Sequence, residues 1–216
     1  KGVKLMSVNK AYSFRIVPTQ EQADLINKTV GCVRFVYNHF LGLSKDNKYL
    51  SFSKFSRQLP ELKNEYPWLR EVDSIALQQS LKDLDSGFQS FCKGQNNYPK
   101  FKSKKKSKQT YRTQYFRRKE SGTVNIEIAD NRIKLPKLGW VKFKKSREVR
   151  GQIQNVTIRQ TNGKYYMSVA VETDRKTIQK EFNEQNAEPM DSSETKIGID
   201  LGLKDYLITS DGEKIK

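Results

Sequence analysis

The chain has 216 residues, enough for one large or two modest domains, and 35% of them are hydrophobic. Lys and Arg number 41 against 24 Asp and Glu, which gives a formal net charge of +17 at pH 7. This excess points to a polyanionic partner, most simply nucleic acid. The sequence shows neither an apolar run of about 18 residues nor a signal peptide, so a membrane protein is not expected.

The cysteines and the single histidine limit the metal chemistry that the chain can support. Cys32 and Cys92 both fall within apolar helical patterns and are predicted to be buried free thiols rather than a disulfide. No Cys-x-x-Cys pair is present, so no zinc site is expected within this chain. His39 lies beside an apolar helical stripe without an evident partner, and we interpret it as structural.

The first predicted element is a strand over residues 10–17, which Pro18 ends. Apolar side chains alternate along it, so Tyr12, Phe14 and Ile16 are predicted to share one face. No other strand lies nearby in the sequence. We therefore expect this strand to join a sheet built from the later part of the chain.

A helix is predicted to begin at Thr19, because Gln22 three residues later completes a capping box. Its apolar stripe continues to about Ser44. A shorter helical stretch follows within residues 51–66, and we expect Pro60 to break it.

A third helix is predicted to start at a cap on Asp73 or Ser74 and to run to about Lys93. Its apolar residues are spaced as one continuous seam, which indicates a core face rather than a cofactor site. The seam consists of Leu77, Leu81, Leu84, Phe88 and Phe91.

The segment from Gly94 to Lys119 contains many basic residues and no acidic one. Aromatic residues are interleaved with the cations, a pattern that favours phosphate contacts combined with base stacking over a merely solvated loop. We expect residues 96–120 to form a basic loop that contacts nucleic acid.

Short strands dominate the sequence after this basic loop. They are predicted at residues 124–128, 132–135, 140–144, 153–160 and 165–172, and Asn162-Gly163 is a strong hairpin signal. Their regular spacing suggests a small barrel or sandwich. The helical region before them is then an insertion into a β-barrel.

A polar linker is predicted over residues 173–195, followed by a two-stranded hairpin at residues 196–201 and 206–209. Asp200 ends the first strand between two glycines. By itself this pattern allows a plain surface hairpin, the first strand of an RNase H-like nuclease, or a phosphate-binding hairpin of an actin-like ATPase. No further strand is expected, so the chain is interpreted as a piece of a longer protein.

Several short stretches occur in an order that matches one known family. They are Phe14-Arg15 with Pro18 and Gln22, GCVRFVYN at 31–38, Trp68-Leu69, ALQQSLKDL at 76–84, YPKFK at 98–102, LPKLGWV at 135–141 and GIDLGLKD at 198–205. Together they resemble the accessory transposase TnpB (OrfB) of insertion sequences. The resemblance covers nearly the whole chain.

The resemblance implies an RNA-guided DNA endonuclease related to type V CRISPR effectors, acting in the prokaryotic cytoplasm at the nucleoid. The expected fold class is α+β, with a wedge-type β-barrel, an inserted helical recognition bundle and the first hairpin of an RNase H-like (RuvC) domain. The implied regions are 1–18 (first barrel strand), 19–95 (helical insertion), 96–172 (barrel with the basic loop), 173–195 (linker) and 196–216 (incomplete RuvC).

The resemblance also implies the chemistry. Asp200 matches the first RuvC carboxylate and is the expected Mg²⁺ ligand, while two further acids and a Cys-rich zinc element are expected downstream. We therefore expect no cleavage by this chain alone. The implied partners are a guide RNA from the transposon end and double-stranded target DNA. A DNA-only transposase end-binding protein and a stand-alone phosphate-chemistry enzyme remain as alternatives.

Candidate contacts fall into two groups. Contacts to the DNA motif are assigned by position in the matching motif and by lying off the apolar seam. These are Ile75, Gln78 and Gln79, with Phe52 and Phe116 as weaker candidates. Contacts to the nucleic-acid backbone are expected from Lys82, Lys100, Lys102, Lys104, Lys105, Lys106, Lys108, Tyr111, Arg112, Arg117, Arg118, Lys142 and Lys144.

Overall fold

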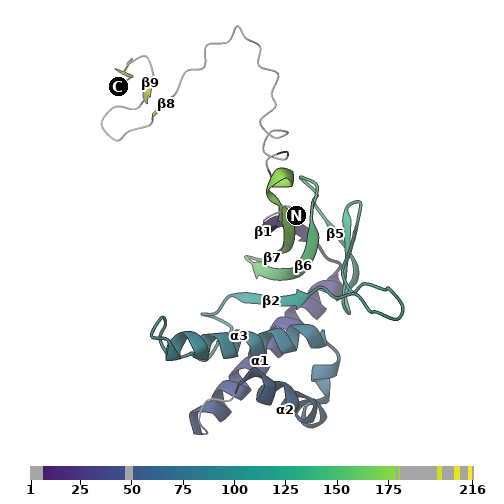
Figure 1. Cartoon of the computed structure of the whole chain (residues 1–216), viewed down its shortest axis with the longest axis vertical. Helices are drawn as coiled ribbons and strands as arrows, with labels where there is room; N and C mark the ends of the chain where they lie inside the picture. The colour runs from purple at the N-terminus through teal and green to yellow at the C-terminus, as the bar shows by residue number, and fades with distance from the viewer. Residues whose placement is uncertain are drawn as a thin grey trace, which may run out of the picture. The chain divides into compact units, whose positions relative to one another are not determined.

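The computed structural model describes residues 7–46, 51–178, 180, 199–200, 207–209 and 214–215. The chain divides into two compact units, Lys1–Arg175 and Lys176–Lys216. In the first unit, three α-helices and a short 3₁₀ helix follow the first strand, and the remaining strands come after them (Figure 1). The elements are β1 (Ser7–Val17), α1 (Gln20–Asp46), α2 (Phe52–Glu65), η1 (Pro67–Arg70), α3 (Ser74–Cys92), β2 (Gln109–Gln114), β3 (Glu127–Ala129), β4 (Arg132–Leu135), β5 (Gly139–Phe143), β6 (Gln152–Thr161) and β7 (Lys164–Asp174).

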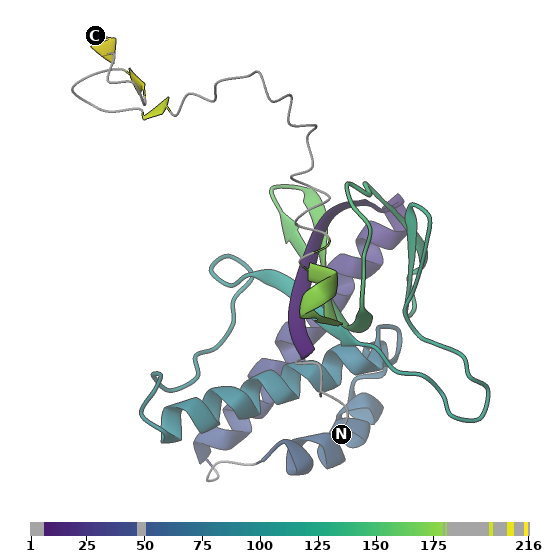
Figure 2. The same cartoon turned by 45° about the horizontal axis from the view of Figure 1, so that its top comes forward.

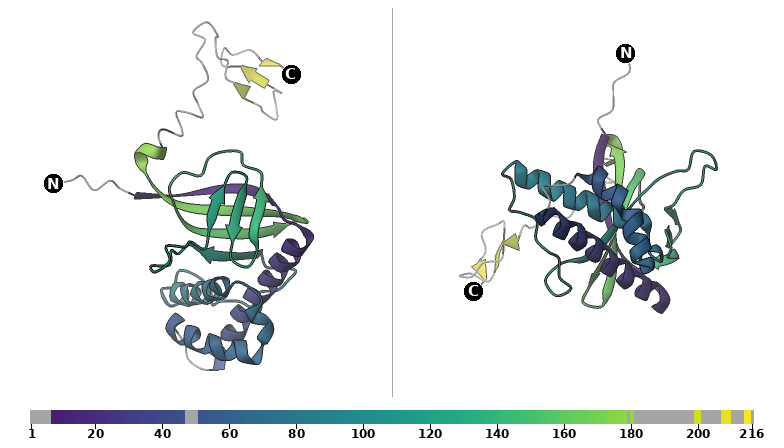
Figure 3. Two further views of the ribbon diagram at one scale, coloured as in Figure 1. Left: turned by 90° about the vertical axis from the view of Figure 1, so that its right-hand side faces the viewer. Right: turned by 90° about the horizontal axis from the view of Figure 1, so that it is seen from below.

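The strands form one antiparallel seven-stranded sheet in the order β2-β6-β7-β1-β5-β4-β3 (Figure 3). Strand β1 lies in its middle, pairing with β7 from Ser7 opposite Asp174 to Ile16 opposite Tyr165, and with β5 at its end. The prediction that the first strand joins the later ones is confirmed. The α+β class is confirmed as well, with the helices inserted between β1 and the remaining strands.

The predicted closed barrel is wrong, because the sheet is open. Closure requires β2 and β3 to pair, and within the described residues they form the two edges of the sheet. Strand β3 is only three residues long. Strand β2 instead packs against α3 and α1, so helices cover one edge of the sheet, which is an established way of protecting an edge (Figure 1).

Local signals in the sequence explain how β1 and α1 form. Tyr12, Phe14 and Ile16 are buried on one face of β1, as predicted. The capping box is present, since the Gln22 backbone N–H donates to Thr19 Oγ1 at 3.3 Å and the Thr19 N–H donates to Gln22 Oε1 at 3.1 Å. The predicted helix start is therefore confirmed.

Helix α2 runs through Pro60 without a break, so the predicted interruption is wrong. A proline inside a helix costs about 3 kcal/mol relative to alanine. The opposite face of α2 buries Phe55, Leu59 and Leu62 completely or nearly so. Each such side chain contributes roughly 1.5–3 kcal/mol, and together they outweigh the cost of the proline.

Helix α3 begins at the predicted cap, where the Ile75 N–H donates to Asp73 Oδ1 at 2.9 Å. Its seam is buried from Leu77 to Phe88, but Phe91 is 42% exposed. Cys92 is also exposed, while Cys32 is buried, and both are free thiols. The predicted burial of Cys92 is wrong because the last turn of α3 extends beyond the core.

Strand β2 was not predicted, because it lies inside the basic segment. Its alternation is nevertheless present, with Tyr111 and Thr113 buried. Strands β4 to β7 lie within one or two residues of their predicted positions, whereas β1 starts three residues earlier and β3 three residues later than expected. The predicted Asn162-Gly163 hairpin is confirmed, with φ angles of 50° and 71° that suit a type I′ turn.

The second unit contains a small antiparallel sheet in the order β10-β9-β8. Its strands are β8 (Ile199–Asp200), β9 (Leu207–Thr209) and β10 (Lys214–Ile215). The predicted pairing of the first two strands is confirmed, with Asp200 opposite Ile208, but the third strand was not expected. The predicted turn at 202–205 and most of the predicted linker lie outside the described residues. Residues 173–174 end β7 and residues 175–178 are helical.

No helix within the part of the chain that the structure describes is long and apolar enough to cross a membrane.

Candidate nucleic-acid interface

The N-terminal half of α3 lies against β2 and presents polar side chains to solvent. Gln78 and Lys82 are exposed, and Ile75 is half-buried. Gln78 and Lys82 are four residues apart, so they are neighbours on one helical face. An exposed glutamine beside a lysine is suited to a base edge and a neighbouring phosphate.

Gln79 occupies a different environment from Gln78. Its side chain is only 7% exposed, and its Nε2 donates to Gln114 Oε1 at 2.9 Å. Lys82 Nζ lies 3.5 Å from the same Gln114 oxygen. The side chain of Gln79 therefore positions Gln114 and is not available to a ligand. Gln114 itself is exposed at the end of β2. Gln114 could not be identified from the sequence, because only the packing of β2 on α3 brings it to this surface.

Phe52 and Lys82 come together although they were predicted for different roles. Lys82 Nζ lies 5.4 Å from the centroid of the Phe52 ring, within the range of a cation–π contact. The Phe52 backbone N–H donates to Asp85 Oδ1 at 2.9 Å, which fixes the start of α2 to α3. We call the group Phe52, Gln78, Lys82 and Gln114 the α3–β2 surface.

Phe116 follows β2 and is 40% exposed. Asn125 fixes this exit, because its Nδ2 donates to the Gln114 carbonyl at 2.9 Å and its Oδ1 accepts from the Phe116 N–H at 2.8 Å. The backbone on both sides of Tyr115 is thus held by one side chain. Asn125 could not be identified from the sequence either, because its partners lie 9 and 11 positions away in an irregular segment.

The basic segment runs between α3 and β2 (Figure 2), and Lys102 attaches it to α1. Asn38 Nδ2 donates to the Lys102 carbonyl and Asn38 Oδ1 accepts from the Lys102 N–H, both at 2.8 Å. Lys102 Nζ lies 3.8 Å from the Tyr37 ring centroid. Burial lowers the pKa of Lys102 below its usual value, and the charge of Asp83 opposes this shift. Lys102 therefore anchors the segment.

Two other predicted backbone contacts lie in unexpected environments. Tyr111 is 5% exposed and packs in the core, and this burial raises the pKa of its hydroxyl group. Its side chain therefore does not reach the surface where the predicted contact would be made. Arg112 forms an ion pair with Asp83, and both side chains are partly exposed. An exposed pair contributes little to stability, and a phosphate can compete with the carboxylate for the guanidinium.

The tip of the basic segment is a hydrogen-bonded turn. The Ser107 N–H donates to the Ser103 carbonyl at 3.0 Å, and the Lys106 N–H donates to Ser103 Oγ at 3.0 Å. Gln109 Nε2 donates to the carbonyls of Lys104 and Ser107 at 2.8 and 2.7 Å. The three consecutive lysines 104–106 are thereby held at the tip and are exposed.

The remaining predicted backbone contacts are all exposed cations. They lie on α3, on the basic segment, after β2 and on or next to β5, and are Lys82, Lys100, Lys104, Lys105, Lys106, Lys108, Arg117, Arg118, Lys142 and Lys144. Exposed cations attract a phosphate backbone without regard to sequence.

The expected metal ligand, Asp200, is the last residue of β8. Its side chain lies outside what the structure describes, and within the described residues no group of three His, Cys, Asp or Glu side chains could hold a metal ion. A carboxylate oxygen at a strand end has the donor chemistry that Mg²⁺ prefers, and this ion commonly uses one or two carboxylates together with substrate phosphates. Asp200 therefore fits as one ligand of such a site.

Comparison with known proteins places these features in a family. A family model described as a helix-turn-helix domain of the OrfB IS605 type matches residues 6–49. The described residues of this region form β1 and the single 27-residue helix α1.

Three relatives have curated names. InsQ of Escherichia coli K12, named as a candidate RNA-guided DNA endonuclease, is 32% identical over 94% of this chain and 48% of its own length. A Streptomyces pristinaespiralis protein of the same description is 28% identical over 98% of this chain and 50% of its own length. The virulence protein VsdF of Salmonella dublin is 37% identical over 41% of this chain and 88% of its own length.

The chain spans about half the length of the first two relatives. The matching domain model, the similarity along nearly the whole chain and the motifs from Phe14 to Asp205 agree with one another. The chain belongs to the TnpB (OrfB) family of transposases encoded by insertion sequences.

Proposed function

We propose that this chain is the nucleic-acid-binding portion of an RNA-guided DNA endonuclease, which holds a guide RNA made from the transposon end and a double-stranded DNA target. The names of the two long relatives support this function. The observation that carries it is the α3–β2 surface, where exposed glutamines stand beside an aromatic ring and a lysine. The net charge of +17 supplies the general attraction to nucleic acid.

In this proposal one group of residues contacts bases and the other contacts phosphates. Gln78, assisted by Ile75 and by Gln114, contacts base edges of the duplex beside the target, since a glutamine amide can pair bidentately with adenine. Phe52 and Phe116 supply apolar contacts. The exposed cations hold phosphates of the RNA or of the heteroduplex, which fixes the register but carries no sequence information.

The open sheet corresponds in this proposal to the wedge domain of the family, and the β8–β10 sheet to the start of the RuvC domain. Asp200 would hold Mg²⁺ there through one carboxylate oxygen, and the bound ion would supply Lewis-acid chemistry for hydrolysis of a phosphodiester. Within these 216 residues the resemblance matches only this one RuvC carboxylate. We therefore propose that the chain by itself binds nucleic acid without cutting it, at the nucleoid of a prokaryotic cell.

The test is the identity of the nucleic acid that copurifies with the protein at about 0.5 M salt, a concentration that breaks most non-specific interactions with phosphate. One discrete RNA that maps to the end of its own element supports the proposal. Heterogeneous RNA, or none, together with specific binding to transposon-end DNA, would instead make the chain a DNA-only end-binding protein.

A further inference from the structure

The face of the sheet opposite the core carries a row of basic and apolar side chains across three strands. Lys142 of β5 lies opposite both Val17 of β1 and Arg132 of β4, and Trp140 lies opposite Lys134. All five side chains are exposed. This row lies at the other end of the strand order from β2, so it is separate from the α3–β2 surface.

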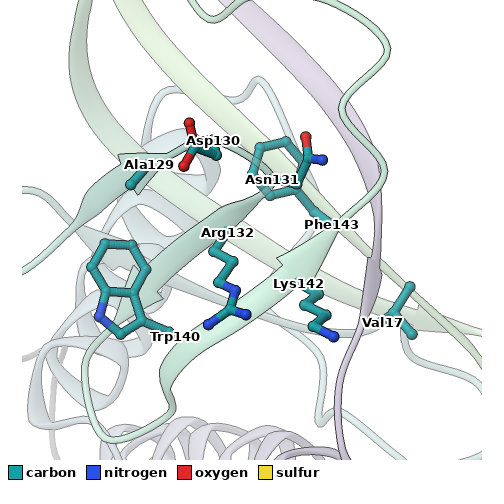
Figure 4. A pocket seen from close by; sticks show the side chains of 8 residues that line it. All are labelled: Val17, Ala129, Asp130, Asn131, Arg132, Trp140, Lys142 and Phe143. Carbon is teal, nitrogen blue, oxygen red and sulfur yellow. The ribbon is translucent and has the colours of Figure 1, made fainter.

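A pocket opens over this row (Figure 4). Figure 4 shows the side chains of Trp140, Arg132, Lys142 and Val17 lying side by side along it. Trp140 is 40% exposed and Val17 is 50% exposed. The pocket is lined by Val17, Ala129, Asp130, Asn131, Arg132, Trp140, Lys142 and Phe143.

The tryptophan is held in place by its backbone. Gln22 Nε2, at the start of α1, donates to the Trp140 carbonyl at 3.0 Å and to the Leu138 carbonyl at 3.1 Å. Lys134 Nζ lies 5.9 Å from the Trp140 ring centroid. These hydrogen bonds fix the backbone that carries the exposed indole, so little backbone freedom is lost on binding, which favours association.

We propose that this pocket holds one unpaired ribonucleotide, with its base stacked on Trp140 and its phosphate held by Arg132 and Lys142. Stacking on an aromatic side chain is the usual way in which proteins hold an unpaired base, and every base offers a face for it. Arginine pairs bidentately with phosphate, and the lysine adds a second charge. This site depends on the proposed function only in requiring that the chain binds RNA.

Asp130 also lines the pocket and favours a ribonucleotide over a deoxyribonucleotide. An ionised carboxylate only accepts hydrogen bonds and repels phosphate. The 2′-hydroxyl of ribose is the backbone group that can donate to it, and DNA lacks this group. An apolar peptide would leave the charges of Arg132 and Lys142 without partners, and the bases of a duplex are already stacked on one another.

The fluorescence of Trp140 provides the direct test. The chain contains two tryptophans, so Trp68→Phe leaves Trp140 as the only one. In this background a single-stranded octaribonucleotide is titrated at fixed salt, alongside DNA of the same sequence and a blunt-ended RNA duplex of the same length. Saturable quenching by the single-stranded RNA, weaker binding of the DNA and no quenching by the RNA duplex are expected. Equal quenching by all three would overturn the assignment.

Variants identify the roles of the individual side chains. Trp140→Ala is expected to weaken binding of the single-stranded RNA by about 10-fold, the effect of removing one stack, while Trp140→Phe retains most of the affinity. Arg132→Gln is expected to weaken binding more than the matched control Arg57→Gln, which removes one exposed charge on α2. Asp130→Asn is expected to reduce the preference for RNA over DNA. Unchanged affinity in a folded Trp140→Ala protein would refute the site.

The two proposals fail in different ways. If the chain binds no RNA in any assay, the proposed function is wrong. If it binds RNA tightly while Trp140 fluorescence and the Trp140 variants remain unaffected, only the ribonucleotide pocket is wrong.

Discussion

Gln79 of α3 donates through its side-chain amide to Gln114 of β2 at 2.9 Å, across 35 positions of the sequence. The bond joins the helix that carries Gln78 to the strand that ends beside Phe116. Because Gln79 is 7% exposed, the bond forms in a partly desolvated environment where an unsatisfied amide is costly. The two neighbouring glutamines of the helix therefore have different roles, one structural and one available to a ligand.

Gln79→Ala is expected to lower the free energy of unfolding by about 1–3 kcal/mol, because it removes a buried hydrogen-bonding side chain and leaves Gln114 Oε1 with only the longer contact to Lys82. Urea denaturation followed by circular dichroism measures this change. The matched control is Gln78→Ala on the neighbouring exposed position, for which we expect a change within about 0.5 kcal/mol. Equal destabilisation by the two variants would contradict the separate roles.

Gln78→Ala is expected to relax the DNA motif preference, because it removes an amide that can contact a base edge. The salt dependence of binding should change little, since the substitution removes no charge. Binding to a library of duplexes with a randomised motif, measured at two salt concentrations with the RNA-loaded protein, checks both points. A uniform loss of affinity on every sequence would argue against base contact by Gln78.

Replacing Lys104, Lys105 and Lys106 together with glutamine is expected to reduce the slope of log affinity against log salt by about 0.9 for each phosphate that the variant no longer neutralises. The turn should persist, because its hydrogen bonds come from Ser103, Ser107 and Gln109 rather than from the lysine side chains. The exposed Lys164, replaced in the same way, is the control for a single surface charge. An unchanged slope in the triple variant would mean that the tip only faces solvent.

Asn38→Ala is expected to release the basic segment from α1, because it removes both hydrogen bonds to the Lys102 backbone. Limited trypsin digestion should then cut after the exposed lysines of residues 100–108 at a higher rate, because a more mobile backbone enters the active site of the protease more easily. Exposed Asn64→Ala on α2 is the control. Cleavage at the wild-type rate would show that the Tyr37 contact alone holds the segment.

The two thiols are expected to react at very different rates. Burial raises the pKa of Cys32 to about 11, with the nearby Lys28 opposing the shift, whereas Cys92 is exposed. Because the thiolate is the reacting form, the raised pKa leaves Cys32 almost entirely protonated, and so slow to react, at pH 8. A chromogenic disulfide reagent at pH 8 should modify one thiol quickly, and Cys92→Ser should remove that phase. Two rapidly reacting thiols in the folded protein would contradict the burial of Cys32.

Local signals were sufficient for much of the fold. The capping box at Thr19, the alternation along β1, the Asn162-Gly163 turn and the cap at Asp73 each depend on residues a few positions apart. Such signals are determined by sterics and hydrogen bonding within one element, so they could be predicted without knowing the rest of the molecule. The exposure of Gln78 and Lys82 followed from the same helical periodicity.

Other features depend on segments that are distant along the chain. Pro60 stays helical because the core holds the opposite face of α2, and the sheet stays open because helices pack against β2. Lys102 becomes an anchor only because Asn38 and Tyr37 meet it. The family, the positive charge and the local elements could thus be derived from the residues alone. The residues alone could not show which polar groups remain available to a ligand, because folding buries some of these groups and pairs others with residues that are distant in the sequence.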